Sequence, residues 1–332
     1  MRVKLTEICT PKQWKTIPAN ELLDKGYPVY GANGIIGYYN EYNHENPVVA
    51  ITCRGATCGT INITVPQSYV TGNAMCLDDT RFDILPEYLY YCLLHYDFNN
   101  VISGSAQPQI TRQGLEKVEI KYYPIEAQKK IVAILSKTRA VITAHHQQLQ
   151  KLDELVKARF VEMFGDSEFD TMQWPTKKLS ELCAVGSSKR IYQNEQSTEG
   201  VPFLRISDLN ERIDNVKNAP ELFIPINKYN ELKENGLVPT EGDILVTSRG
   251  TLGRCYIVRP EDEFYFQDGM ISWLSDLNSQ ITSVYLSQLF AMSGIQKQIA
   301  SLQAGSTVAY LSIAMLKKLN IMLPPLDLQE QF

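Results

Sequence analysis

Three glycines at a spacing of three, Gly31, Gly34 and Gly37, stand in the stretch YGANGIIGYYN and could hold a ligand. Glycine-rich loops bind phosphate when they follow G-x-G-x-x-G or G-x-x-x-x-G-K-[ST], because backbone N–H groups and a lysine then converge on the anion. This stretch fits neither pattern, and aromatic and polar residues follow it rather than an amphipathic helix. The glycines therefore indicate turns that let the backbone approach a flat or bulky partner, with a nucleotide site as the alternative.

Metal chemistry is not indicated by the cysteine and histidine pattern. The seven cysteines are scattered, without a C-x-x-C pair or a clustered histidine, whereas structural zinc sites usually show both. His145 and His146 are adjacent, but neighbours on a helix point about 100° apart and do not easily share a metal. We therefore expect no metal and no other cofactor, and we expect buried, reduced thiols.

The composition is ordinary for a globular protein and leaves room for two cores. Of 332 residues, 44% are hydrophobic and 21% are charged. The N-terminus MRVKLTEICT has no signal-peptide pattern, and no apolar run approaches the roughly 18 residues of a membrane span. We expect a cytoplasmic protein without membrane contact. The formal net charge of −5 argues mildly against a nonspecific nucleic-acid binder, although a basic face can coexist with an acidic back.

The chain contains an internal duplication. Three blocks recur in the same order: VKLTEIC (3–9) and KKLSELC (177–183); VVAITCRGATCG (48–59) and DILVTSRGTLGR (243–254); SGSAQPQITRQGLEKVEIKYYPIEAQKKI (103–131) and AGSTVAYLSIAMLKKLNIMLPPLDLQEQF (304–332). The second block aligns Arg54 with Arg249, and the third aligns Gln128 with Gln329. Three blocks in one order predict two domains of similar fold.

Each copy is predicted to be a small α/β (α+β) domain. Runs rich in β-branched residues at 46–53, 59–65, 242–250 and 254–259 predict strands, with Gly, Asn and Pro turns between them. Apolar residues at three-to-four spacing in 85–98 and 281–302 predict one packed helix per copy.

Residues 125–166, between the copies, predict one long helix that no Gly or Pro interrupts before Gly165. About 39 residues at ~1.5 Å per residue give a rod of roughly 58 Å. Such a rod is too long to bury its apolar seam against one small domain, so we expect coiled-coil pairing with another helix. The residues expected to make this pairing are Ile131, Leu135, Ile142, Leu149, Leu152 and Val156.

These features together resemble the specificity subunit of type I restriction-modification enzymes. The resemblance is carried by the Pro-x-x-x-Gln helix entries (124–128 and 325–329), the helix ending LDELVKARFVEMFGD and the YGANGIIGYY segment, and it covers essentially the whole chain. It implies two target-recognition domains held apart by an antiparallel pair of helices, each domain reading one half of a split DNA sequence. We accordingly divide the chain into a first recognition domain (1–124), a spacer helix (125–166), a second recognition domain (167–325) and the start of a second helix (326–332).

The resemblance also implies the partners and a non-catalytic role. The partners would be double-stranded DNA, subunits that methylate adenine and a motor-nuclease subunit. The sequence agrees, because NPVV (46–49) lacks the second proline and the aromatic of the [DNS]-P-P-[YFW] amino-methyltransferase motif, and EGDILVTSRG (241–250) lacks the E-x-K of many nucleases. Two alternatives stay open: a nucleotide-dependent enzyme, and a coiled-coil scaffold or homodimeric DNA-binding protein that acts alone.

Candidate DNA contacts are polar residues and glycines in predicted loops, since base-edge contacts specify sequence and phosphate contacts position the protein. In the first copy they are Asn33, Gly34, Arg54, Gly55, Asn73, Ser105, Gln107 and Gln109; in the second they are Arg205, Arg249, Gly250, Ser306, Thr307 and Tyr310. A fixed structural ion pair is the alternative for Arg54 and Arg249, because each follows a strand and precedes a glycine.

The second helix departs from the usual layout of that family. The sequence stops at Phe332, at the position equivalent to Ile131. Two expectations follow: the natural protein continues, or a short form pairs its long helix with that of another molecule.

Overall fold

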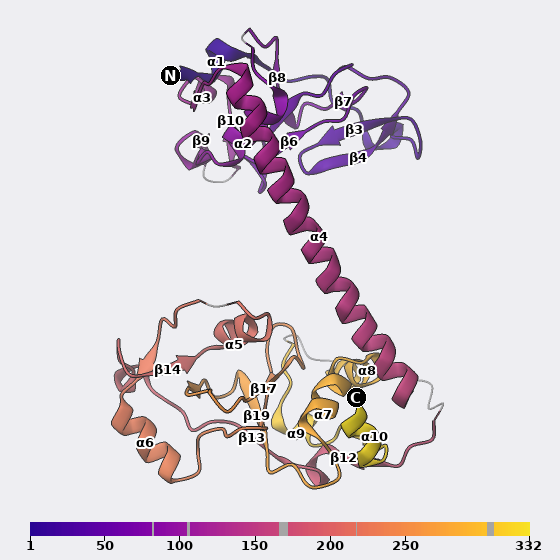
Figure 1. The fold of residues 1–332 in the computed structure, drawn as a ribbon, viewed down its shortest axis with the longest axis vertical. Coiled ribbons are helices and arrows are strands. Elements are labelled where there is room, and N and C mark those ends of the chain that lie inside the picture. The colour runs from indigo at the N-terminus through magenta and orange to yellow at the C-terminus, as the bar shows by residue number, and fades with distance from the viewer. Residues whose placement is uncertain (82, 105–106, 166–171, 217, 304–308) are drawn as a thin grey trace. The chain divides into compact units, whose positions relative to one another are not determined.

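The computed structural model describes residues 1–81, 83–104, 107–165, 172–216, 218–303 and 309–332. The chain divides into two compact units, Met1–Gln148 and Leu149–Phe332. One helix, α4 (Ile125–Phe164), contributes part of its length to each unit (Figure 1). Both units mix helices with strands, which confirms the expected fold class of two tandem α/β domains joined by a long helix.

The first unit contains a four-stranded and a three-stranded sheet. The antiparallel four-stranded sheet has the order β2 (Thr10–Lys12), β8 (Ala74–Asp78), β5 (Val49–Thr52), β6 (Ile61–Ile63). The three-stranded sheet has the order β4 (Gly34–Tyr39), β3 (Tyr27–Gly31), β7 (Tyr69–Val70), with β3 and β7 parallel. Two further pairs join β1 (Arg2–Lys4) to β11 (Glu119–Lys121) and β9 (Ile102–Ser103) to β10 (Gln109–Ile110). Its remaining helices are α1 (Leu5–Ile8), α2 (Pro86–Leu94) and α3 (Arg112–Leu115), with 3-10 turns at Ala19–Glu21 and Phe98–Asn100.

Both faces of the four-stranded sheet are buried, and strand β8 shows how. Successive side chains of a strand point to opposite faces. Met75 and Leu77 therefore pack into the main core, which also holds the apolar face of α2. Ala74 and Cys76 pack on the other face, in a smaller cluster with β3 and β7. This double burial explains why β5 has no exposed position.

The second unit repeats this topology. Its four-stranded sheet has the order β13 (Ala184–Gly186), β19 (Ile271–Ser275), β16 (Ile244–Thr247), β17 (Cys255–Ile257). Its three-stranded sheet has the order β15 (Phe223–Ile224), β14 (Val201–Leu204), β18 (Tyr265–Phe266), and β14 and β18 are parallel like their counterparts. The remaining pair is β12 (Thr176–Lys178) with β20 (Asn320–Met322). The helices are α5 (Ile206–Ile213), α6 (Ile226–Glu234), α7 (Ser283–Phe290), α8 (Ser293–Leu302), α9 (Ile313–Leu316) and α10 (Leu326–Gln331), with 3-10 turns at Leu179–Glu181 and Gln193–Glu195.

The two units agree in register as well as in strand order. Val3 pairs with Ile120 in the first, and their aligned counterparts Lys177 and Ile321 pair in the second. The backbone N–H of Leu5 donates to Val118 O at 2.8 Å, and that of Leu179 donates to Leu319 O at 3.0 Å. The repeat in the sequence is therefore a repeat of the fold.

The expected strands are confirmed as β5, β6, β16 and β17, but the helix predictions need correction in the second unit. The single helix expected over 281–302 is two helices, because Met292 has an extended backbone that breaks the run. Gln296 Nε2 donates to the Phe290 carbonyl oxygen at 2.7 Å and satisfies the end of α7. Helices α5 and α6 were not expected; they lie in the chain between β14 and β16, where the first unit has strand β4 (Figure 1).

Helix α4 is anchored at each end by one unit. Near its start, Ile131 and Val132 pack against the first core. Near its end, Phe160 and Phe164 are buried in the second core, where both rings contact Tyr285. Gly165 then adopts the left-handed conformation, φ 79°, that commonly ends helices, as its sequence position predicts. Within the described ranges, no helix is long and apolar enough to cross a membrane.

Candidate nucleic-acid interface

In the first unit, the chain turns sharply after strand β5 and presents Arg54 and Gly55. The N–H of Gly55 donates to Pro108 O at 3.1 Å, and the N–H of Ile110 donates to Cys53 O at 3.0 Å. These bonds place Arg54 directly opposite Gln109 in an isolated β-bridge. Two candidates that lie 55 positions apart in the sequence are thereby brought together.

Two more loops reach the same corner. Thr52 Oγ1 donates to the carbonyl oxygen of Ala32, next to the candidate Asn33. The N–H of Cys53 donates to Asn73 O at 3.1 Å. The exposed side chains at this end of β5 include Asn33, Arg54, Asn73, Gln107 and Gln109. The structure therefore gathers the described first-copy candidates on loops that meet at one sheet end.

The corner formed by Arg54 and Gly55 is open. In the described part of the chain, the exposed Arg54 side chain has no hydrogen-bond or ion-pair partner, so the alternative of a fixed ion pair finds no support there. Gly55 has φ 89°, a conformation that only glycine adopts without strain, and nothing lies within 4 Å of where its Cβ would be. Gly34 is likewise left-handed, φ 94°, with the same open space. Backbone and guanidinium are thus both accessible to a ligand.

The second unit has the same backbone pairing at its corner, but the side chains that face each other there are different. Arg249 lies opposite Tyr310 in the equivalent bridge, and Gly250 is left-handed with φ 70°. The N–H of Leu311 donates to Ser248 O at 3.0 Å, which repeats the Ile110–Cys53 bond. The Arg249 guanidinium carbon lies 5.3 Å from the centre of the Tyr310 ring, in cation–π range. This contact holds the arginine at the surface without neutralising it.

A cavity of about 560 Å³ adjoins this second corner and contains residues that the sequence analysis missed. Arg249 and Tyr310 line it together with Arg190, Gln193, Gln196 and Gln267. The Arg190 side chain is 65% exposed and its Nε lies 2.8 Å from Asp268 Oδ2. The polar run KRIYQNEQ (189–196), with one Arg, two Gln and one Asn, was the available signal, because these side chains make bidentate contacts to bases.

The structure places Arg205 in a different setting from the other candidates. Its Nη2 lies 2.6 Å from Glu221 Oε2 and its Nε lies 3.4 Å from Asp208 Oδ2. The hydrogen bond to Glu221, followed by that to Asp208, raises the pKa of the guanidinium. Arg205 is thus compensated within its own domain, at the start of α5. The candidates Ser105, Ser306 and Thr307 lie outside the described residues.

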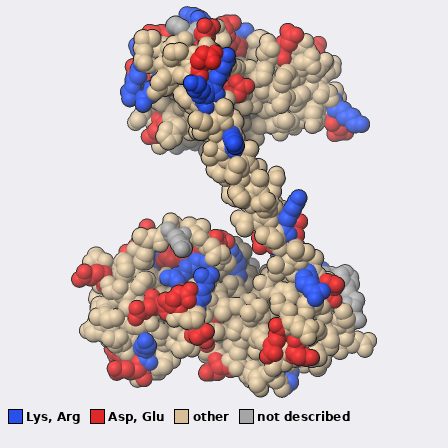
Figure 2. All heavy atoms as spheres, viewed as in Figure 1, with Lys and Arg blue, Asp and Glu red and all other residues tan. Residues whose placement is uncertain are grey.

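Charge is not concentrated on the visible face of either unit. Figure 2 shows acidic and basic side chains interspersed over both units, and the middle of α4 exposes mainly uncharged residues. The face shown therefore does not present a broad basic surface that would attract DNA phosphates. At the two corners, Arg54 and Arg249 are exposed and have no acidic partner among the described residues.

The expected helix-pairing residues fall into two groups. Ile131 is partly buried against the first core, so only part of its side chain is open to another helix. The remaining five are exposed by 39 to 59%: Leu135, Ile142, Leu149, Leu152 and Val156. Their successive spacings are 7, 7, 3 and 4 residues, which fit a heptad repeat and leave an apolar seam on α4.

Comparison with known proteins identifies the family. Residues 1–154 and 172–332 each match the type I restriction modification DNA specificity domain. The chain belongs to this family and contains its domain twice, as the resemblance in the sequence implied.

Individual relatives agree. A protein of Haemophilus influenzae assigned as the type I restriction enzyme specificity subunit S.HindORF215P is 25% identical over 328 residues, which cover 96% of this chain and 81% of that protein. The type I restriction enzyme MjaVIII specificity subunit of Methanocaldococcus jannaschii is 26% identical over 73% of this chain and 60% of its own length. The fold is similar to the crystal structure of the S subunit from M. genitalium, with a TM-score of 0.64 at 15% identity, covering all of this chain and 86% of that one.

Proposed function

We propose that each domain of this chain reads one half of a split DNA site through the corner that carries Arg54 or Arg249. The observation that supports this most directly is that both corners repeat the same backbone frame while their facing residues differ, Gln109 in one and Tyr310 in the other. A shared frame with different side chains is what two readers of different half-sites need. Arginine pairs bidentately with guanine, and glutamine with adenine, in the major groove.

The chain itself is proposed to do no chemistry. In its place, adenine-methyltransferase subunits and a motor-nuclease subunit would act on the DNA that the two domains select. Family membership supports this division of labour, together with the missing methyltransferase and nuclease motifs in the sequence.

The exposed seam of α4 is proposed to pair with the α4 helix of a second copy. Leu149 and Leu152 are 59% and 55% exposed on a helix whose two ends are buried in its own domains. Burying a leucine side chain contributes roughly 1.5 to 3 kcal/mol, so several in one seam can offset the entropy of association. An antiparallel pair about a two-fold axis would let each seam residue meet the seam of its mate.

Copurification with the methyltransferase subunits, followed by mapping of methylated adenines in the host genome, tests the proposed function. A split motif, with two defined halves and an unspecified spacer, is the expected result. If the assembled complex shows no sequence-selective DNA shift and no methylation motif, the scaffold alternative is correct. A rise in melting temperature with nucleotide alone would instead support the nucleotide-dependent alternative.

A further inference from the structure

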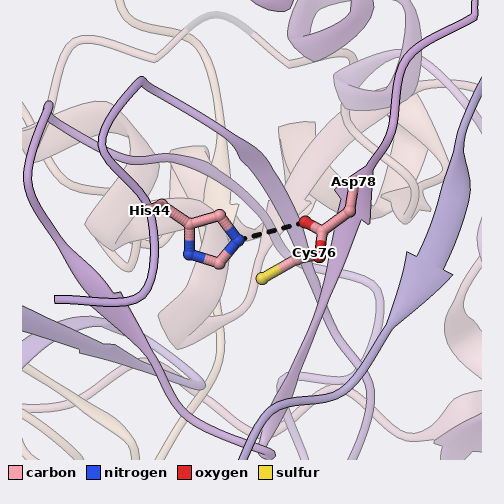
Figure 3. A group of neighbouring side chains, drawn as sticks. All are labelled: His44, Cys76 and Asp78. Carbon is pink, nitrogen blue, oxygen red and sulfur yellow. Dashed lines mark hydrogen bonds and ion pairs between the residues drawn. The ribbon is translucent and has the colours of Figure 1, made fainter.

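Three side chains that could bind a metal meet in the first unit, away from the Arg54 corner. His44, Cys76 and Asp78 each offer one donor atom, and these three atoms lie within 4.8 Å of one another (Figure 3). Cys76 and Asp78 are two residues apart on strand β8 and so point to the same face of the sheet. His44 comes from the connection between β4 and β5 and reaches this face from the side, with Nε2 3.0 Å from Asp78 Oδ1.

The imidazole of His44 is held so that Nε2 faces the other two donors. Asn43 Nδ2 donates to the Val70 carbonyl oxygen at 3.0 Å, and Asn43 Oδ1 accepts from the Val70 N–H at 2.9 Å, which fixes the orientation of the amide. Oδ1 also lies 2.6 Å from His44 Nδ1. Since an amide oxygen can only accept, Nδ1 must carry the proton. Nε2 is the ring nitrogen that faces the Asp78 carboxylate, so either a proton on Nε2 or a bound metal ion can lie between the two groups.

The carboxylate has an outer partner as well. The indole N–H of Trp14 donates to Asp78 Oδ2 at 3.0 Å, which leaves Oδ1 directed at the histidine. Metal-binding histidines and carboxylates are typically oriented in this way by hydrogen bonds on their far side. A cavity of about 420 Å³ adjoins the group, and Asn43, His44 and Asp78 line it, so water can complete a coordination sphere.

We propose that His44 Nε2, Cys76 Sγ and Asp78 Oδ1 bind one divalent transition-metal ion of the zinc class. One sulfur, one imidazole nitrogen and one carboxylate oxygen form a donor set that suits Zn²⁺ or Co²⁺, with water as a fourth ligand. The ion would fasten the β4–β5 connection to strand β8.

Metal binding at this position would release a proton. Cys76 is fully buried. Because a cysteine binds a metal as its thiolate, the metal replaces the thiol proton, which passes to the solvent buffer.

The second unit offers an internal comparison. Lys12 pairs with Cys76 and Thr10 with Asp78 between β2 and β8; in the matching strands, Gly186 pairs with Trp273 and Ala184 with Ser275. The positions of Cys76 and Asp78 are therefore occupied by residues that cannot form this site. The proposed ion belongs to the first unit alone.

Titration of the chelator-treated full chain with Co²⁺ tests the proposal, because a cobalt–thiolate bond absorbs in the near ultraviolet. One equivalent should produce this absorption and raise the melting temperature. C76S should abolish the absorption. W14F, which removes the hydrogen bond to Asp78 Oδ2 but keeps an aromatic ring beside His44 and Lys12, should weaken affinity about 10- to 100-fold. The control C92S, on helix α2, should behave like the parent protein.

Two results would overturn the site. One is a folded parent protein with neither the absorption nor a metal-dependent change in melting temperature, which would assign the His44–Asp78 contact to a simple ion pair. The other is undiminished absorption in C76S. Circular dichroism establishes that each variant is folded, and H44Q, which keeps a polar side chain at the same place, serves if C76S does not fold.

Discussion

Gln128 in the first unit and Gln329 in the second make equivalent sets of three hydrogen bonds. Gln128 accepts from the Leu85 N–H at 2.9 Å and donates to Asp83 O and Tyr123 O at 2.8 and 2.7 Å. Gln329 accepts from the Thr282 N–H at 3.0 Å and donates to two carbonyl oxygens, both at 2.9 Å. Both side chains are buried, at 0 and 2% exposure. Each glutamine thus ties the start of a helix, α4 or α10, to the loop before the packed helix of its domain.

Replacing Gln128 by Ala should destabilise the first domain. The partly buried Leu85 N–H would lose its acceptor, and leaving a buried polar group unsatisfied costs at most about 1 to 3 kcal/mol. Denaturant unfolding monitored by circular dichroism measures the change in unfolding free energy. Gln147→Ala, at an exposed position of the same helix, is the matched control and should change it by less than about 0.5 kcal/mol. Equal effects of the two substitutions would refute a structural role for Gln128.

The duplication made this pair predictable, because both glutamines stand in identical Pro-x-x-x-Gln sequences. Strands β5 and β16 were predictable for a similar reason: continuous burial gives them uninterrupted apolar runs. Helices α5 and α6 were not, since each buries few apolar side chains, Leu209 in α5 and Tyr229 and Leu232 in α6. The contact between His44 and Asp78 was not predictable for another reason: it exists only because segments distant in the sequence pack together.

The sequence suggests which residues are candidates for DNA contact, but it does not show which of them are already paired with an acidic side chain inside the protein. Arg54, Arg205 and Arg249 are equivalent as residue types. Only the fold shows that Arg205 is compensated by Glu221 and Asp208, whereas Arg249 lies beside Tyr310 and has no acidic partner in the described residues. The residues that pair with a given arginine come from distant segments of the chain, and no local sequence pattern predicts where those segments lie.

Replacing Arg54 or Arg249 by Ala should weaken specific DNA binding by about 1 to 3 kcal/mol and relax specificity at one base pair. Titration of the assembled complex with labelled cognate and single-substituted DNA measures this. Arginine-to-lysine variants are the matched controls, since lysine keeps the charge but loses the bidentate geometry. Full activity of the lysine variants, with equal loss on random DNA for alanine, would assign these residues to phosphate contacts instead.

Replacing both Leu149 and Leu152 by Asp should dissociate the proposed dimer without unfolding either domain, because charged residues in an apolar seam oppose its burial. Light scattering at micromolar concentration gives the oligomeric state, and circular dichroism reports folding. Gln147→Asp with Gln150→Asp adds the same charge at exposed positions outside the seam and should leave the dimer intact. A monomeric parent protein would rule out self-pairing.

Cys9 and Cys183 should alkylate slowly in the folded protein. Burial raises the pKa of each from its ordinary value of 9.0 to about 12, and the neutral thiol is unreactive. Because the folded pKa lies above the unfolded one, this contribution to stability is complete below pH 9 and is lost as pH rises toward about 12. Mass spectrometry after iodoacetamide treatment at pH 8 gives the order of reaction. Modification of Cys9 in the folded protein as fast as in urea would contradict the assignment.

The central claim, two independent readers on one chain, is tested most directly by exchanging the first domain. Residues 1–124 are replaced by those of another family member, the hybrid is assembled with methyltransferase subunits, and methylated adenines are mapped. Since the Arg54 and Arg249 corners lie in separate units, we predict a motif in which one half changes and the other stays the same. A change in both halves, or in neither, would contradict the account.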